Sequence, residues 1–200
     1  MSVMLDIFGS VFIAGMLLLL ILKLNLFAST ASYSADTELK LQQNAKTLAE
    51  ILNYDLRKVG YKYNGVAITH ADSNKIEFYT DMQYPGQAGH GTPDVIEYTV
   101  LDSTHAAGTT NPRDIILVRT LNGTEVLEGP SLGLVDLKFT YLDSTGVNKI
   151  PYLTPGQYQN IRYIKTEIWV EAADPINDMI TDSLQYQRTY WEFTIHPRNI

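Results

Sequence analysis

The sequence has 200 residues, which is enough for one domain of ordinary size with an appended segment. It carries 22 acidic and 15 basic residues, giving a formal net charge of −7. This balance argues against a general nucleic-acid-binding protein, because there is no basic surplus to displace counterions from phosphates. The absence of cysteine excludes disulfides, thiol catalysis, thiolate zinc sites and covalent haem attachment.

The first segment of the chain, residues 1–35, is predominantly apolar, and its only charged residues are Asp6 and Lys23. The uncharged stretch 7–22 would rise about 24 Å as an α-helix, and Lys23 can extend that reach by snorkelling. We therefore predict an apolar helix that spans a membrane or forms the core of a filament. A cleaved secretory signal is the alternative. The small residues at 28–32 favour it, whereas Asp6 opposes it, because such signals begin with basic residues.

A second helical segment is predicted at residues 36–60, where apolar residues recur at helical spacing. These residues are Leu41, Ala45, Leu48, Leu52, Leu56 and Val59. They define one face that should pack against the domain that follows, while most charged residues lie off this face. We expect one near-continuous helix from about Leu5 to Val59, with Gly60 at its C-terminal end.

Residues 61–200 change to a two-residue period, which predicts an antiparallel β-rich globular domain. The alternation predicts strands at 75–80, 95–101, 114–119, 125–127, 134–142, 164–171 and 190–195. Asn122 and Gly123 predict a tight hairpin turn. The segments 83–94 and 172–185 are expected to be surface loops. The fold class is therefore α+β, with a long N-terminal helix packed on an antiparallel β-sheet domain.

Enzyme motifs are weak in this sequence. Gly129–Gly133 matches the G-x-S-x-G pattern around Ser131, but a nucleophile elbow needs a strand, a sharp turn and then a helix. Here a strand is predicted to follow, so a simple turn explains the pattern better. No enzymatic activity and no cofactor are expected.

Metal motifs are equally weak. The four histidines, His70, His90, His105 and His196, are scattered without the spacing of metal ligands and are expected in loops or at the surface. Oxygen ligands for calcium could come from Asp174, Asn177, Asp178 and Asp182, but these residues miss the pattern of a calcium-binding loop. A solvated loop is the simpler interpretation, so no metal site is predicted.

Several segments resemble, in their order along the chain, those of type IV pilin-like proteins. They are the helix end at 49–61, the strand and turn at 137–146, the strand opening at 161–164 and the terminal segment 196–200. The larger minor pilins and the J-type minor pseudopilins of type II secretion are the most similar. The resemblance implies an apolar helix that continues as an amphipathic helix on an antiparallel sheet, in a subunit of an extracellular filament.

The apolar helix is also where subunit assembly is expected, at Asp6, Phe8, Gly9, Phe12, Gly15 and Leu19. The family places an acid at the fifth position of the mature chain, which Asp6 would occupy after removal of Met1. The resemblance therefore implies that the Asp6 carboxylate pairs with the free α-amine of a neighbouring subunit. Alternatively, Asp6 lies among lipid headgroups and caps the helix. Gly9 and Gly15 either allow close helix approach or have no such role.

Two functions therefore remain. In the first, the chain is a structural subunit of a type IV pilus-like filament at the cell surface, inserted in the inner membrane before assembly. Its partners are then copies of itself, with other pilin-like subunits as further candidates. In the second, it is a singly anchored extracytoplasmic binding module or a minor pseudopilin of a type II secretion system. The amphipathic continuation favours the filament over the anchored module, because a mere anchor needs no helix fused into its own domain.

Overall fold

The computed structural model describes residues 2–106, 108–146, 155–178 and 183–200. The chain divides into two compact units, Met1–Leu39 and Lys40–Ile200. A single helix, α1 (Ser2–Leu56), runs through both units. Most of the amphipathic segment, from Lys40 onward, therefore belongs to the second unit with the sheets.

The first unit consists of α1 alone. Its large apolar side chains between Val3 and Phe27 are all between 52% and 75% exposed. The hydroxyls of Ser10 and Thr30 donate hydrogen bonds back to the carbonyls of Ile7 and Leu26, each at 2.9 Å, so these polar groups are satisfied within the helix. Within the described part of the chain, α1 is the one helix that is long and apolar enough to cross a membrane, judged by length and composition.

The second unit contains the C-terminal part of α1, ten strands and one 3₁₀ helix among its described residues. All strand pairs are antiparallel. The strands are β1 (Ile68–Ala71), β2 (Lys75–Thr80), β3 (Asp94–Leu101), β4 (Ile116–Leu121), β5 (Glu125–Glu128), β6 (Leu134–Leu142), β7 (Tyr163–Glu171), β8 (Ile176–Asp178), β9 (Ser183–Gln185) and β10 (Arg188–Ile195), and the 3₁₀ helix η1 is Pro155–Asn160.

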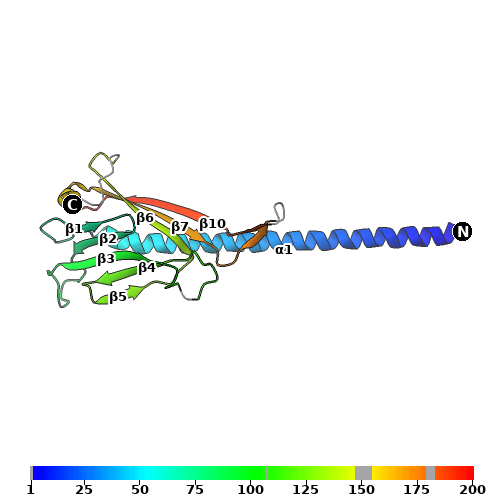
Figure 1. The fold of residues 1–200 in the computed structure, drawn as a ribbon, viewed down its shortest axis with the longest axis horizontal. Helices are drawn as coiled ribbons and strands as arrows, with labels where there is room; N and C mark the ends of the chain where they lie inside the picture. Colours follow the sequence, from blue (N-terminus) through cyan, green and yellow to red (C-terminus); the bar gives the residue numbers. More distant parts are fainter. Residues whose placement is uncertain (1, 107, 147–154, 179–182) are drawn as a thin grey trace. The chain divides into compact units, whose positions relative to one another are not determined.

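The strands form three sheets. The largest has the order β1-β2-β3-β4-β5, the second β10-β7-β6, and β8 pairs with β9 alone. Figure 1 shows the first two sheets on either side of the cyan part of α1. Two backbone hydrogen bonds connect these sheets along β6: the N–H of Ile115 donates to Leu134 at 2.7 Å, and that of Phe139 donates to Ser73 at 2.6 Å.

The core of the second unit lies between α1 and these two sheets. The six residues expected on the packing face of the helix are between 0% and 4% exposed, and they belong to one cluster with residues of both sheets. They are Leu41, Ala45, Leu48, Leu52, Leu56 and Val59. Large side chains from the sheets, among them Phe78, Phe139 and Ile168, are fully enclosed in the same cluster.

The helix ends at Leu56, three residues before the expected end at Val59. After Leu56 the chain tightens, because the N–H groups of Lys58 and Val59 donate to carbonyls three residues earlier. Gly60 then donates its N–H to Tyr79 of β2 at 2.8 Å, with a φ of +75°. Gly60 therefore joins the chain to the sheet. A Cβ there would also lie 2.6 Å from the carbonyl oxygen of Asn199.

The strand predictions were largely correct, with three departures. Strand β1 was not expected, and the segment 172–185, expected to be a loop, contains β8 and β9. The third departure is in β6, where the register shifts between Leu134 and Asp136. Because of this irregularity Leu134 is buried, while Val135 is only half-buried although it alternates in step with the buried residues Leu137 and Phe139.

The hairpin turn between β4 and β5 matches its prediction. Asn122 and Gly123 both have positive φ, at 53° and 69°, and the N–H of Thr124 donates to the carbonyl of Leu121 at 3.2 Å. The side chain of Asn122 adds a link to the neighbouring strand, because its Oδ1 accepts from the N–H of Val95 at 2.8 Å. Asparagine therefore serves both the turn geometry and the pairing of β3 with β4.

Two adjacent helix residues provide a test of this packing. Leu52 is 0% exposed, whereas Ile51 on the next position is 45% exposed. Leu52→Ala should lower the free energy of unfolding by about 2–5 kcal/mol, because it removes buried methyl groups and leaves a cavity. Ile51→Ala should lower it by no more than about 0.5 kcal/mol. Denaturant unfolding of the full chain in detergent would measure both, and equal losses would contradict the assigned face.

Candidate functional site

The apolar part of α1 carries the residues expected to act in assembly. Phe8, Phe12 and Leu19 are 72%, 69% and 62% exposed. Their spacing places them on one side of the helix together with Gly15. A Cβ added at Gly9 or Gly15 would meet nothing within 4 Å, so the surface at both positions is open.

This surface needs a partner. A continuous run of large exposed apolar side chains is strongly unfavourable in water, so it requires either lipid or other apolar helices. Asp6, also exposed, is the single carboxylate in the first 35 residues of the sequence. The free energy of its charge therefore depends most strongly on whether lipid or other apolar helices surround the helix.

A buried polar cluster joins α1 to the five-stranded sheet in the second unit. The Asp55 carboxylate accepts a hydrogen bond from Arg119 Nε at 2.6 Å and from the Tyr98 hydroxyl at 2.7 Å. The Asp55 side chain is 5% exposed and that of Arg119 17%. Asp55 lies near the helix end, while its partners come from β3 and β4, so the cluster fixes the helix against both strands.

The electrostatic effects in this cluster are mutual. Burial, followed by the negative charge and hydrogen bond of Asp55, holds the pKa of Tyr98 far above its ordinary value. Burial acts against the charge on Arg119, but the hydrogen bond and charge of Asp55 outweigh it, so the pKa of Arg119 is raised. The guanidinium therefore stays charged and Tyr98 stays protonated, as their hydrogen bonds to Asp55 require.

Arg119→Met tests the contribution of this cluster. It leaves a buried carboxylate without its cation, which should cost about 3–5 kcal/mol of unfolding free energy. The matched control is Lys46→Met. Lys46 and Glu50 pair at 3.7 Å with side chains 65% and 69% exposed, so the loss there should be at most about 1 kcal/mol. Similar losses for both variants in denaturant unfolding would show that the cluster contributes nothing specific.

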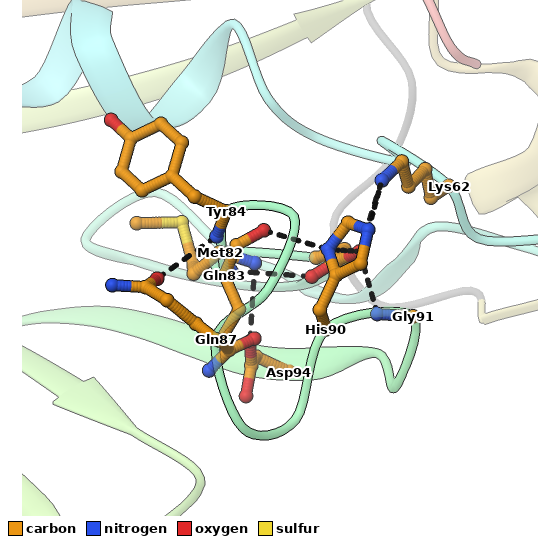
Figure 2. A network of polar contacts seen from close by, with 9 residues as sticks. Lys62, Met82, Gln83, Tyr84, Gln87, His90, Gly91 and Asp94 are labelled. Carbon is orange, nitrogen blue, oxygen red and sulfur yellow. Dashed lines mark hydrogen bonds and ion pairs between the residues drawn. The ribbon is translucent and has the colours of Figure 1, made fainter.

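A second polar network closes the loop between β2 and β3. The Asp81 side chain is 1% exposed and accepts hydrogen bonds from the N–H groups of Gln83 at 3.2 Å and Gly91 at 3.0 Å. Lys62 Nζ lies 3.6 Å and His90 Nδ1 3.4 Å from its carboxylate. Figure 2 shows Lys62 and His90 meeting beside the loop, where Lys62 Nζ and His90 Nε2 are 3.2 Å apart.

The other end of this loop is held by Asp94. One of its carboxylate oxygens accepts from the N–H of Met82 at 3.1 Å, and the other from the Asn122 side chain at 2.8 Å. The tip between these ends is exposed, and Tyr84 there is 65% exposed. The segment is thus a surface loop, as predicted. Its ends, however, are anchored by two buried carboxylates that sequence reasoning did not single out.

The stability of the loop between β2 and β3 should depend on pH through the ionisation of Asp81. Burial acts to raise the pKa of Asp81, but the N–H groups of Gly91 and Gln83, helped by His90 and Lys62, outweigh it and lower the pKa below the ordinary value of 3.8. Because the folded pKa lies below the unfolded one, the contribution of Asp81 is complete above the unfolded pKa. It is lost as the pH falls through the folded pKa.

Amide NMR shifts would measure this dependence. In the wild type, the Gly91 and Gln83 amides should move together as the pH falls below 3.8, and this step should vanish in Asp81→Asn. The Gly86 amide, which makes no hydrogen bond to this carboxylate, serves as the internal control. A step that persists in Asp81→Asn would assign the titration to another group.

The residues considered for chemistry are not brought together as a catalytic site. Ser131 lies in a turn that leads directly into β6, so the strand, turn and helix of a nucleophile elbow are not formed. Its hydroxyl accepts from the N–H of Gly133 at 3.3 Å, and the nearby Asp114 has a pKa raised by burial, which outweighs the lowering by the Thr109 and Ser131 side chains. No histidine contact of Ser131 is found in the described part of the chain, so a base to activate it is missing there.

The histidines and loop acids also remain separate. His70 lies on β1, not in a loop, and His90 belongs to the Asp81 network. His105 is exposed and contacts Asp102, while His196 is exposed and its ring lies 4.8 Å from that of Tyr163. Asp182, considered for calcium, lies outside the described residues, as do the side chains of Asn177 and Asp178. Across the residues that are described, no group of three or more histidines and acids could hold a metal ion.

Comparison with known proteins gives a match at the level of structure. No protein-family model and no curated protein matches the sequence significantly. A solved structure, the type IV-like pilin of Thermus thermophilus, matches with a TM-score of 0.51 and 12% identity. The match covers 80% of this chain and 97% of that one. The chain has a type IV pilin-like fold.

The apolar N-terminal part of α1 in this pilin-like chain fits a membrane anchor by its length and composition. The α+β class expected from the sequence is confirmed, with one long helix and antiparallel sheets. The residues expected to act in assembly lie exposed on the apolar segment of α1, and the residues expected to pack the helix lie in the core of the pilin-like domain.

Proposed function

We propose that this chain is a structural subunit of an extracellular type IV pilus-like filament. One observation carries the proposal: a single helix, α1, is apolar and exposed from Val3 to Phe27 and then supplies the buried face from Leu41 to Leu56. The first segment would pack with the same segment of other copies. The second joins it to a β-domain displayed on the outside of the filament.

The physical reason for assembly is the apolar surface of the first segment. Each square ångström of apolar surface removed from water contributes about 25 cal/mol, and a helix with apolar residues on every side offers such surface to several neighbours at once. In the inner membrane, lipid would cover this surface before assembly. In the filament, helices of neighbouring copies would replace the lipid, with Gly9 and Gly15 allowing close approach.

Asp6 would set the position of one copy relative to the next. Within a bundle of apolar helices, its carboxylate needs a positive partner, because an unpaired charge there is costly. The α-amine at the start of a neighbouring chain is the natural partner. In an anchored binding module, by contrast, Asp6 would lie among headgroups and need no partner.

Asp6→Ala separates these two functions. In a filament, the variant leaves an uncompensated amine, at a cost of about 3–5 kcal/mol for each contact, so surface filaments should be lost or strongly reduced. Asp36→Ala is the matched control, because it removes an exposed acid of the same helix beyond its apolar segment. Filaments are counted by electron microscopy of sheared material, beside a membrane-fraction blot of each variant.

The outcomes differ clearly. Loss of filaments in Asp6→Ala, with normal filaments in Asp36→Ala and normal membrane insertion of both, supports the proposal. Normal filaments in Asp6→Ala remove the charge-pair role of Asp6. Wild-type cells that insert the chain but make no filaments would favour the anchored binding module.

A further inference from the structure

The pilin-like domain has an open groove between α1 and β10. It has a volume of about 750 Å³ and is lined by helix residues from Lys46 to Lys58 and by strand residues 191–193. A pocket of about 540 Å³ shares Arg57 with this groove and adds His196 and Arg198. We refer to the two together as the α1–β10 groove. Both lie within the second unit of the chain.

Strand β10 leaves this groove open because it is an edge strand. It pairs with β7 on one side, and its other edge makes no backbone hydrogen bond to any segment of the described residues. Trp191 and Phe193 share a face with Ile195, which is 4% exposed, yet Trp191 is 40% exposed and Phe193 is half-buried. The groove therefore combines an unpaired sheet edge with open aromatic surface.

The groove also holds free positive charge in an acidic protein. Neither Arg57 nor Arg198 has an acidic partner in the part of the chain that the structure describes, although the net charge is −7. Its two glutamates are already paired: Glu50 lies 3.7 Å from Lys46, and Glu192 lies 3.0 Å from Lys165. The unpaired charge that remains is positive and suits an acidic occupant.

Strand β5 (Glu125–Glu128) offers the complementary surface. It is the outer strand of the five-stranded sheet, and all four of its residues are exposed, with Val126 at 55% and Leu127 at 61%. Neither Glu125 nor Glu128 pairs with a cation in the described structure. Because side chains alternate along a strand, each face of β5 presents one apolar residue and one glutamate.

We propose that β5 of one copy docks in the α1–β10 groove of a second copy and extends the sheet beyond β10. The face of β5 turned toward the groove would place one glutamate near Arg57 and Arg198 and one apolar residue against Trp191 and Phe193. Strand addition of this kind gains main-chain hydrogen bonds along two free edges. The two surfaces are different patches of the same chain, so the contact would repeat from copy to copy.

This inference rests on the proposed filament and names the contact between its outer domains. The absence of cysteine allows a clean test, because engineered cysteines are the sole thiols in the full chain. The double variant Val126→Cys with Glu192→Cys is treated with a short bismaleimide on cells that express it. The contact predicts a ladder of covalent multimers, whereas each single variant gives no ladder.

Two controls make the result specific. Pairing Val126→Cys with Asn64→Cys, an exposed residue outside the groove, should give no ladder. Reversing the charge of the groove with Arg57→Glu and Arg198→Glu should abolish the ladder formed by the Val126→Cys and Glu192→Cys pair. Adding Glu125→Arg and Glu128→Arg to that variant should restore it. Salt at about 1 M, where the Debye length is near 3 Å, should weaken the ladder.

Filaments are counted on the same cells so that the two proposals fail separately. Filaments without a ladder overturn the docking of β5 and leave the subunit proposal intact. A ladder without filaments supports the docking and counts against the filament. If neither filaments nor a ladder form, the result counts against both proposals. A ladder that persists after charge reversal overturns the role of Arg57 and Arg198.

Discussion

The backbone hydrogen bonds of α1 are satisfied within the helix, so the same element is stable in an apolar environment and against a protein core. The side chains of each part of α1 determine whether that part lies in an apolar environment or against the protein core. From Val3 to Phe27 they are apolar all round and exposed, and from Leu41 to Leu56 they are apolar on one face, which is buried. The helix therefore passes from a segment that needs partners to one that completes its own domain.

Apolar packing and polar contacts contribute differently to that domain. The apolar face of α1 contributes buried apolar area. This area alone would change little if the helix rotated or shifted slightly. Asp55 fixes the position of the helix, because its carboxylate must lie at hydrogen-bond distance from both Arg119 and Tyr98. A buried ion pair contributes little net stability when compared with an apolar replacement, so we interpret its role here as the selection of one arrangement of the helix.

The sequence predicted those features that depend on local pattern. Period and composition predicted both parts of α1, most strands and the Asn122–Gly123 turn, because neighbours along the chain determine them. Strand β1 and the β8–β9 pair were missed, since such short strands depend on partners that a pattern does not show. Asp55 left a signal, being a carboxylate on the apolar face between Leu52 and Val59. Its partner Arg119 lies in a distant strand, so the sequence could not identify it.

On this view α1 serves two separate purposes, assembly before about residue 28 and domain stability after about residue 40. The decisive measurement is the thermal unfolding of a chain lacking residues 2–28, monitored by circular dichroism. We expect a folded α+β domain whose helix and strand signals are lost together in one cooperative transition. A chain that is unfolded, or that loses its helix signal without a transition, would show that the domain needs the apolar segment and would contradict this division of the helix.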